Sequence, residues 1–278
     1  MKIGFLQFAP AWLDPEATLR AIERFSPQFA GVDLLVLPEL CNSGYNLESP
    51  AQAWAASEEI DHSAFLDSLA ATCRHHGCYI VSGFNEREGD CLFNSAVLVG
   101  PRGSIGHYRK LHLFMNEKDF FQPGNAGLPV FDIGLCKVGM LVCFDWLFPE
   151  VWRILALKGA DVICHPSNLV LPRLAQQAVP IHALMNRVYV VTANRIGSEG
   201  HLTFTGMSTI ADPRGEVLAQ ASSADQELRV AEVDLDLARD KAITSRNDVL
   251  ADRRPEEYVL LCERGRGKVA FPHEGEAS

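Results

Sequence analysis

Short apolar runs of strand length alternate with amphipathic runs of helical length along the whole chain, and few folds accommodate such a pattern. The order is strand, helix, strand, helix, then several strands in succession, then strand–helix alternation again. This order predicts an α/β domain in which helices cover a large sheet system. No low-complexity linker or change of composition divides the chain, so we expect a single domain over residues 1–278. The predicted strands lie at 3–8, 33–39, 78–84, 93–100, 104–112, 137–143, 161–166, 189–194, 207–212 and 229–235.

The helical segments carry recognisable boundary signals. Asp14 precedes a segment at 15–30 that has a proline in its first turn, where proline is favoured. The segment at 63–77 ends on a glycine, and the segment at 148–160 again has a proline near its start. A further helix is predicted to follow Pro180.

Composition excludes several classes of function. The chain of 278 residues has a net charge of −10, which argues against a nucleic-acid surface, since such a surface needs clustered Lys and Arg. No run approaches the ~20 apolar residues of a membrane span. The N-terminal run breaks at Pro10 and has no small-residue cleavage site, so an opening strand is favoured over a signal peptide. The eight cysteines show no disulfide-framework spacing, and we expect free thiols in a cytoplasmic protein.

Three chemically useful side chains follow predicted strands. Glu39 ends DLLVLPE, Lys110 ends HYRK and Cys143 ends GMLVC. Active sites of α/β folds gather beyond the carboxyl ends of strands. A thiol can attack a carbonyl carbon, a carboxylate can move protons, and an ammonium can stabilise an oxyanion. Together the three residues meet the demands of acyl transfer.

Each of these residues also has an ordinary structural interpretation. Cys143 precedes a predicted helix with Pro149 in its first turn, and the helix dipole lowers the pKa of a thiol there. A buried, inert core cysteine remains the alternative. For Glu39 the alternative is a carboxylate in a surface turn, and for Lys110 it is a solvated strand lysine.

The segments LLVLPELCNSGY, YRKLHLF and GMLVCFDWLFPE, in this order, resemble the signature of the nitrilase superfamily of carbon–nitrogen hydrolases. NEKDFFQPGN, ALKGADVICHPSN, NRVYVVTANRIG and DRRPEEY are similar to further segments of that family. The resemblance extends from the first strand to Tyr258. It implies a four-layer α-β-β-α sandwich, with two sheets packed face to face and helices outside.

The resemblance also implies site roles. Cys143 would be the nucleophile, Glu39 the general base, and Lys110 an oxyanion stabiliser together with the backbone N–H of Phe144. Glu117 matches a further family glutamate, with an exposed loop glutamate as the alternative. The family needs no cofactor.

Family members generally associate through outer helices and C-terminal segments. We therefore expect a homodimer or a higher homo-oligomer. The chain from Leu235 onward is charged and predicted to be helical, and residues 236–278 are expected to pack on the surface or on a partner subunit.

Residues around these segments are candidates to line a substrate pocket: Tyr45, Trp146, Asn168 and His165. For His165, a hydrogen-bonded structural role is the alternative. The segment CRHHGC at 73–78 combines possible metal ligands, but structural zinc sites draw paired ligands from two segments, so no metal site is expected.

These observations predict a cysteine hydrolase that acts on a small amide or N-carbamoyl compound through a thioester. Family branches differ after the nucleophile, with Cys-Trp-Glu in nitrilases, Cys-Tyr-Asp in aliphatic amidases and Cys-Asn-Asp in carbamoyl amino-acid hydrolases. Cys-Phe-Asp-Trp matches none of them fully, and its aspartate favours the amidase side. Hydrolysis of a small nitrile is the first alternative. A catalytically silent binding or regulatory protein and an acyltransferase are the others.

Overall fold

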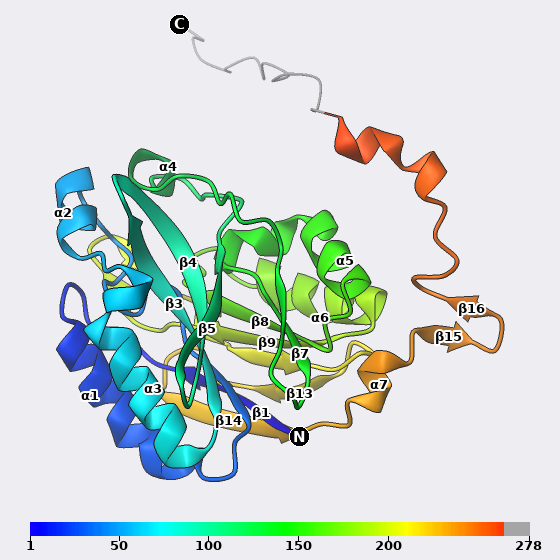
Figure 1. The fold of residues 1–278 in the computed structure, drawn as a ribbon, viewed down its shortest axis with the longest axis horizontal. Coiled ribbons are helices and arrows are strands. Elements are labelled where there is room, and N and C mark those ends of the chain that lie inside the picture. The colour runs from blue at the N-terminus through cyan, green and yellow to red at the C-terminus, as the bar shows by residue number, and fades with distance from the viewer. Residues whose placement is uncertain (264–278) are drawn as a thin grey trace, which may run out of the picture. The chain divides into compact units, whose positions relative to one another are not determined.

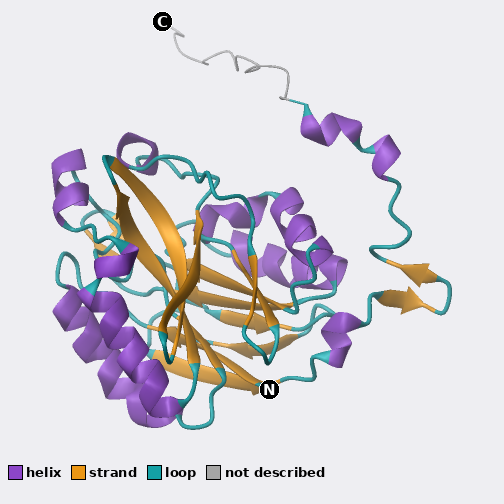
Figure 2. Cartoon of the chain, in the orientation of Figure 1, coloured by secondary structure: helices purple, strands orange, loops and turns teal. Residues whose placement is uncertain are grey.

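Two six-stranded sheets form the centre of the larger of two compact units in the computed structural model, which describes residues 1–263. This unit is Met1–Lys241, and the second begins at Ala242. In the larger unit the sheets pack face to face, with strands β1, β2 and β3 of one against β8 and β9 of the other (Figure 1). Helices cover the outer faces, which confirms the predicted four-layer α-β-β-α sandwich (Figure 2).

The first sheet combines distant parts of the chain. Its central strands β1, β2 and β3 are parallel, because helical connections cross between them, whereas β3, β4 and β5 form an antiparallel meander of long strands. The last strand, β14, pairs antiparallel with the first strand of the chain. In spatial order the strands are β14 (Glu227–Glu232), β1 (Lys2–Gln7), β2 (Leu34–Val36), β3 (Tyr79–Glu88), β4 (Cys91–Gly100) and β5 (Gly103–Arg109).

The second sheet repeats this plan. Its three central strands β7, β8 and β9 are parallel, and antiparallel strands close both edges. In spatial order the strands are β13 (Val217–Gln220), β12 (Thr209–Ala211), β9 (Tyr189–Asn194), β8 (Val162–Ser167), β7 (Lys137–Met140) and β6 (Val130–Asp132). A separate two-stranded ribbon pairs β10 (Ser198–Glu199) with β11 (Leu202–Thr203). Parallel central strands bring their carboxyl ends to one edge of each sheet.

Two pairs of helices form the outer layers. α1 (Pro15–Phe25) and α3 (Ala64–His76) lie over the first sheet, while α5 (Pro149–Leu157) and α6 (Leu174–Asn186) lie over the second (Figure 1). The predicted boundary signals operate: the Asp14 carboxylate accepts from Ala17 N at 2.8 Å, and Gly77 ends α3 with φ +67°. Shorter helical turns are α2 (Pro50–Ala55), α4 (Glu117–Phe120), α7 (Asp236–Arg239), and 3₁₀ turns at Ser26–Phe29, Ile60–His62 and Cys143–Leu147.

The structure corrects two sequence-based expectations within this unit. The helix predicted to follow Pro180 begins earlier, at Leu174, and contains the proline in its interior. A proline there removes one backbone hydrogen bond and crowds the carbonyl of Gln176, but burial of Ala175, Val179 and Ala183 in the core favours the helix. The short edge strands β6 and β13 have no distinctive apolar run and were not predicted.

The described part of the second unit is not the helical segment expected from Leu235 onward. It contains a hairpin of β15 (Ala242–Thr244) and β16 (Asn247–Asp248), followed by 3₁₀ turns at Pro255–Glu257 and Val259–Cys262. The segment AITSRND combines β-branched and turn-forming residues, and Pro255 interrupts any longer helix. The remainder of the predicted segment, 264–278, lies outside the described residues.

One close contact between backbones shows how the fold positions the later site. A Cβ atom on Gly83 of β3 would lie 2.3 Å from the Cα atom of Glu39, so only glycine allows this approach. Two backbone hydrogen bonds on either side of this contact hold the Glu39 loop against β3. Gly83 N donates to Pro38 O (3.0 Å), and Cys41 N donates to Gly83 O (3.1 Å).

We therefore predict that Gly83→Ala lowers the free energy of unfolding by about 2 kcal/mol or more, because the added methyl must displace backbone rather than a flexible side chain. Urea unfolding followed by circular dichroism measures the change. Gly89→Ala, whose Cβ would meet nothing within 4 Å, is the control and should cost about 1 kcal/mol for its positive φ. Equal destabilisation by the two substitutions would contradict the prediction.

Candidate active site

Glu39 lies in the loop directly after β2 and has no exposed surface. Its Oε1 accepts hydrogen bonds from Lys110 Nζ and from Asn94 Nδ2, both at 2.8 Å. Its backbone carbonyl accepts from Asn168 Nδ2 at 2.9 Å. Its second oxygen, Oε2, is buried and has no hydrogen-bond partner among the described residues. Glu39 is therefore a fixed carboxylate with one unused acceptor atom.

Lys110 follows the last residue of β5, where Asn94 O of the neighbouring strand β4 accepts from its backbone N at 2.8 Å. Its side chain has no exposed surface, and Nζ donates to Glu39 Oε1 and Glu117 Oε1 at 2.8 Å each. A buried ammonium is stable only when charged partners and hydrogen bonds replace water. Two carboxylates fulfil that role here.

Glu117 begins the short helix α4 and is 5% exposed, so it is not the exposed loop glutamate that the sequence left as an alternative. Its Oε1 accepts from the Tyr45 hydroxyl at 2.8 Å as well as from Lys110, and its Oε2 accepts from Phe114 N at 3.2 Å. Tyr45 is thus connected to Lys110 through this one carboxylate.

A buried ion pair holds the Tyr45 loop. Glu199 Oε2 accepts from Tyr45 N at 2.9 Å and from Asn46 N at 2.7 Å, and Glu199 Oε1 bonds to Arg195 at 2.5 Å. The Arg195 guanidinium also lies 4.2 Å from the centre of the Phe204 ring. These residues fix the backbone next to Tyr45.

Cys143 follows the end of β7 and begins a 3₁₀ turn with φ +42°, a conformation that is uncommon for a residue other than glycine. Asp145 holds this turn: its Oδ2 accepts from Val142 N (3.0 Å) and from the Tyr108 hydroxyl (2.7 Å). Its Oδ1 lies 3.1 Å from His112 N and 2.8 Å from His112 Nδ1. Such strained residues persist where surrounding contacts over-determine them, often at functional sites.

The other candidate residues occupy different positions around Cys143. Trp146 and Asn168 line the same cavity as Cys143. His165 is fully buried and is not among the cavity-lining residues; its Nε2 lies 2.9 Å from the Cys143 carbonyl oxygen, and its Nδ1 lies 3.1 Å from Thr192 Oγ1. Burial lowers the pKa of His165 to about 4, so a neutral ring contacts the backbone of the strained residue.

Burial and mutual charge shift the acid–base properties of the site. Burial raises the pKa of Glu39 above its ordinary value, although the positive charge of Lys110 opposes the rise. Burial also raises the pKa of Cys143 well above its ordinary value, and the negative charge of Glu39 adds to this. Burial alone would lower the pKa of Lys110, but Glu117 and Glu39 outweigh it and raise that pKa. The thiol is therefore protonated at neutral pH and needs a base to become a nucleophile.

Two neighbouring cavities, called below the inner lobe and the outer lobe, both have Phe114 and Val170 in their lining. The inner lobe contains the thiol. The outer lobe contains Tyr45 and Glu117. The inner lobe is lined by Phe114, Cys143, Phe144, Trp146, Asn168, Leu169, Val170 and Leu171.

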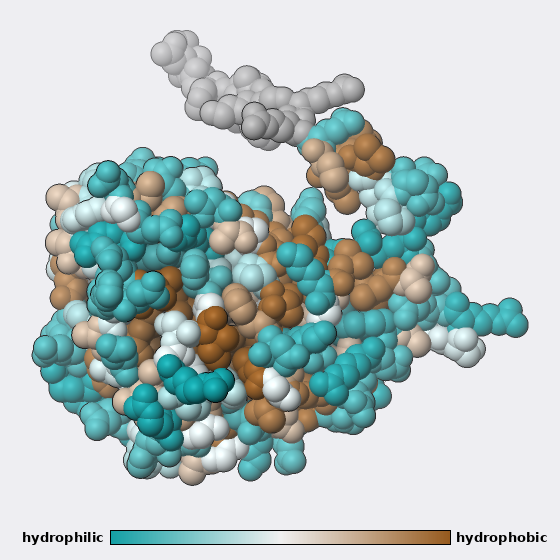
Figure 3. Space-filling view, in the orientation of Figure 1, coloured by the Kyte–Doolittle hydropathy of each residue, from teal (hydrophilic) through white to brown (hydrophobic). Residues whose placement is uncertain are grey.

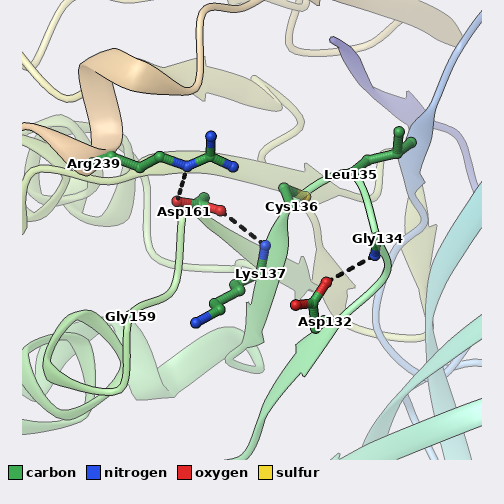
Figure 4. Close-up of a pocket in the computed structure, with 8 residues that line it drawn as sticks. All are labelled: Asp132, Gly134, Leu135, Cys136, Lys137, Gly159, Asp161 and Arg239. Atoms are coloured by element: carbon green, nitrogen blue, oxygen red, sulfur yellow. Dashed lines mark hydrogen bonds and ion pairs between the residues drawn. The ribbon is translucent and has the colours of Figure 1, made fainter.

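A second cavity, of about 410 Å³, lies where β7 begins and contains a different cysteine (Figure 4). Asp161 accepts from Lys137 N at 2.9 Å and from Arg239 Nε at 3.4 Å. Burial raises the pKa of Cys136 to about 12, and no lysine–carboxylate group like that at Cys143 surrounds it. This cavity lacks the features of an acyl-transfer site.

In residues 1–263, no three His, Cys, Asp or Glu side chains are arranged to hold a metal ion. The residues of CRHHGC have other contacts: Cys73 lies on the buried face of α3 in the core, and His76 Nε2 lies 2.6 Å from Ser26 Oγ. All eight cysteines are free thiols. No helix within the same described range has the length and apolar character to cross a membrane.

Several site residues escaped sequence analysis: Asn94, Tyr108, His112, Arg195 and Glu199. Each lies far from Cys143 in the sequence. Tyr108 and His112 lie in YRKLHLF and Arg195 lies in NRVYVVTANRIG, but the resemblance of these segments to the family gave the three residues no role. The sequence did offer one signal for such residues: FNSAV and TANRIG place polar residues within otherwise apolar, strand-like runs. These polar residues are buried in the structure, where polar side chains are uncommon.

The site thus brings a cysteine with a positive φ together with a buried lysine that two carboxylates share. The chain belongs to the carbon–nitrogen hydrolase family, whose model matches residues 2–242. It is therefore a carbon–nitrogen hydrolase of the nitrilase superfamily, as the sequence motifs predicted.

Individual relatives include both nitrilases and amidases. The chain is 49% identical over 260 residues to a nitrilase of Pyrococcus abyssi, covering 93% of this chain and 99% of that one. It is 34% identical to an (R)-stereoselective amidase of Pseudomonas sp, covering 91% and 92% of the two chains. Among solved structures, a variant amidase from Nesterenkonia sp. AN1 superposes with a TM-score of 0.80 at 28% identity over 93% of this chain and 95% of that one. That structure carries the acetamide moiety of fluoroacetamide on its active-site cysteine.

Asn94 provides a test of the electrostatics. Its hydrogen bond to Glu39 lowers the Glu39 pKa, so Asn94→Leu should raise this pKa further. Because a carboxylate with a raised pKa keeps its proton to higher pH, the acidic limb of the kcat/KM profile should move to higher pH.

The pH profile of ammonia release measures this shift. Asn247→Leu, in the second unit, is the control and should leave the profile unchanged. An acidic limb that stays in place or moves to lower pH would contradict the assignment of Glu39 as the titrating group.

Proposed function

We propose that this hydrolase cleaves the non-peptide C–N bond of a small amide through a thioester on Cys143, releasing ammonia and a carboxylic acid. The observation that carries the proposal is the buried group of Glu39, Lys110 and Glu117 beside the Cys143 cavity. Glu39 supplies a carboxylate oxygen without a hydrogen-bond partner among residues 1–263, Lys110 supplies an ammonium and Cys143 supplies a thiol. These are the components of nucleophilic acyl transfer.

In the first half-reaction, Glu39 takes the thiol proton as Cys143 Sγ attacks the amide carbon. The developing negative charge on oxygen is stabilised by Lys110 and by the backbone N–H of Phe144. Glu39 then gives its proton to the leaving nitrogen, the C–N bond breaks and ammonia departs. Glu117 holds Lys110 in position because it accepts one of the three ammonium protons.

In the second half-reaction, Glu39 takes a proton from a water molecule as that water attacks the thioester carbon. The C–S bond breaks, the thiolate recovers a proton from Glu39, and the acid leaves. The two steps need no cofactor, since one carboxylate carries the proton in both directions.

Nitrile hydrolysis is the second candidate, and the 49% identity to the Pyrococcus abyssi nitrilase favours it. The same thiol would add to the nitrile carbon, and Lys110 would stabilise negative charge on nitrogen. An N-carbamoyl substrate is a further variant of the same chemistry.

Cys143→Ala should abolish ammonia release from amides and nitriles while leaving the unfolding transition near that of the parent enzyme, because it removes only the nucleophile. The assay is ammonia release over a panel of amides, N-carbamoyl compounds and nitriles. Cys91→Ala, at an exposed cysteine, is the control and should keep full activity. Retained turnover in Cys143→Ala, or an acyl adduct found by mass spectrometry on Cys41 or Cys164 instead, would refute the mechanism.

We further propose a cytoplasmic homodimer or higher homo-oligomer that associates through α5 and α6. Large apolar side chains on these helices are exposed: Ile154 (39%), Leu157 (45%), Ile181 (52%) and Met185 (49%). In Figure 3 the last described turn of the second unit, Val259–Cys262, shows brown, apolar surface. Val259, Leu260 and Leu261 in this turn are exposed, and a partner subunit would cover them. Eight free thiols suit a reducing compartment.

Ile181→Glu should therefore convert the assembly toward monomers, because a charge at the centre of an apolar interface is left without water. Light scattering after size-exclusion chromatography gives the mass. Val217→Glu, on an edge strand with similar exposure (47%), is the matched control. An unchanged mass for Ile181→Glu, or a monomeric parent, would contradict this assembly.

A further inference from the structure

We propose that the acyl group accepted by Cys143 is short, uncharged and apolar, and that Phe114, Trp146 and Val170 select it. This inference rests on the proposed function and narrows its substrate class. It applies equally to an amide and to a nitrile, because both place the same acyl group beside the thiol.

Apart from the Glu39–Lys110 group that acts on the scissile C–N bond, the inner lobe offers no charged side chain to the acyl group. Apart from Cys143 and Asn168, every side chain that lines it is aromatic or aliphatic. Asn168 Nδ2 already donates to Glu39 O. A carboxylate or ammonium on the acyl group would lose its water here and gain no ionic partner, which costs free energy in binding.

The outer lobe does not supply the missing charge either. Its one acidic side chain, Glu117, uses Oε1 for Lys110 and Tyr45 and Oε2 for Phe114 N. His201 at this lobe is exposed and remains in water. The remaining lining is Tyr45, Asn46, Leu47, Phe114, Met115, Asn116, Phe120, Phe121, Val170 and Leu202.

Size is limited by volume and by a packed aromatic wall. The inner lobe has a cavity volume of about 20 Å³ and the outer lobe about 70 Å³. A water molecule needs on the order of 10–15 Å³ by this measure, so the free space beside the thiol is small and favours a short acyl group over a bulky one. Phe144 lies with ring-centre distances of 5.0 Å to Phe114 and 5.6 Å to Phe148, and Phe148 stacks on His112 at 3.5 Å. These contacts support the wall from behind.

The first experiment compares acyl groups of matched length on the wild-type enzyme. Butyramide is measured against succinamate, which carries a carboxylate, and against 4-aminobutyramide, which carries an ammonium. We expect kcat/KM for each charged amide to be lower by at least about 30-fold, equivalent to about 2 kcal/mol. The corresponding nitriles are measured in the same way as a second series. A difference smaller than about 30-fold between the uncharged compound and either charged compound, in the series that the enzyme turns over, would overturn the inference.

Phenylacetamide and butyramide test the size limit. We expect the larger amide to be the poorer substrate, and Val170→Ala to raise its kcat/KM relative to butyramide. Wild-type preference for phenylacetamide would overturn the size part of the inference, as would an unchanged ratio in Val170→Ala.

A charge introduced into the lining tests selection directly. Leu171→Arg places a cation at the half-exposed rim of the inner lobe (41% exposed) and should raise the succinamate-to-butyramide ratio by about tenfold. Leu218→Arg, at an edge-strand leucine of similar exposure (42%), is the control and should leave the ratio unchanged. An equal ratio in both variants would overturn the role of the lining.

Failure of the inference and failure of the proposed function give different results. If charged amides are turned over as well as butyramide, and Cys143 is loaded with acyl group, the function stands and the selectivity inference fails. If no panel member releases ammonia in a Cys143-dependent way, the proposed function fails.

Discussion

The side chain of Lys110 has no exposed surface, and its ammonium lies 2.8 Å from carboxylate oxygens of both Glu39 and Glu117. A single buried ammonium would be unstable, and two facing carboxylates without it would repel each other. The three charges therefore require one another. Because they come from three different segments, the contact ties the loop after β2, the end of β5 and helix α4 into one rigid group.

This charged group determines the resting state of the cysteine. Burial keeps the Cys143 thiol protonated, and the negative charge of Glu39 acts in the same direction. Within residues 1–263, Glu39 Oε2 has no hydrogen-bond partner, which suits the role of base that we propose for it. The Asp145 turn and the neutral His165 ring hold the Cys143 backbone at φ +42°. The Cys143 thiol is thus oriented by backbone contacts, whereas its pKa is set by burial and by side-chain charge.

Sequence analysis predicted the main strands and helices because each carried its own local signal, whereas the four-layer arrangement was implied by the family resemblance. The strand at 189–194 is observed with those bounds as β9, and Asp14 and Gly77 mark helix ends as expected. The start of α6 and the C-terminal segment were mispredicted for one reason. In both cases a local signal was given too much weight. Pro180 was taken as the start of a helix, but tertiary packing allows α6 to continue through it. The charged segment after Leu235 was taken as a helix, but its turn-forming residues give a hairpin and 3₁₀ turns.

The sequence by itself determined the residue types of the chemistry, since Glu39, Lys110 and Cys143 each stand in a segment with a recognisable pattern. It also determined the order of strand-length and helix-length segments along the chain, and an α/β fold follows from that order. Only the tertiary structure decided that Glu117 faces Lys110, that Asn94 bonds to Glu39, and that apolar walls enclose Cys143. Those facts depend on contacts between segments distant in the chain, and such contacts leave no periodic trace in a single sequence.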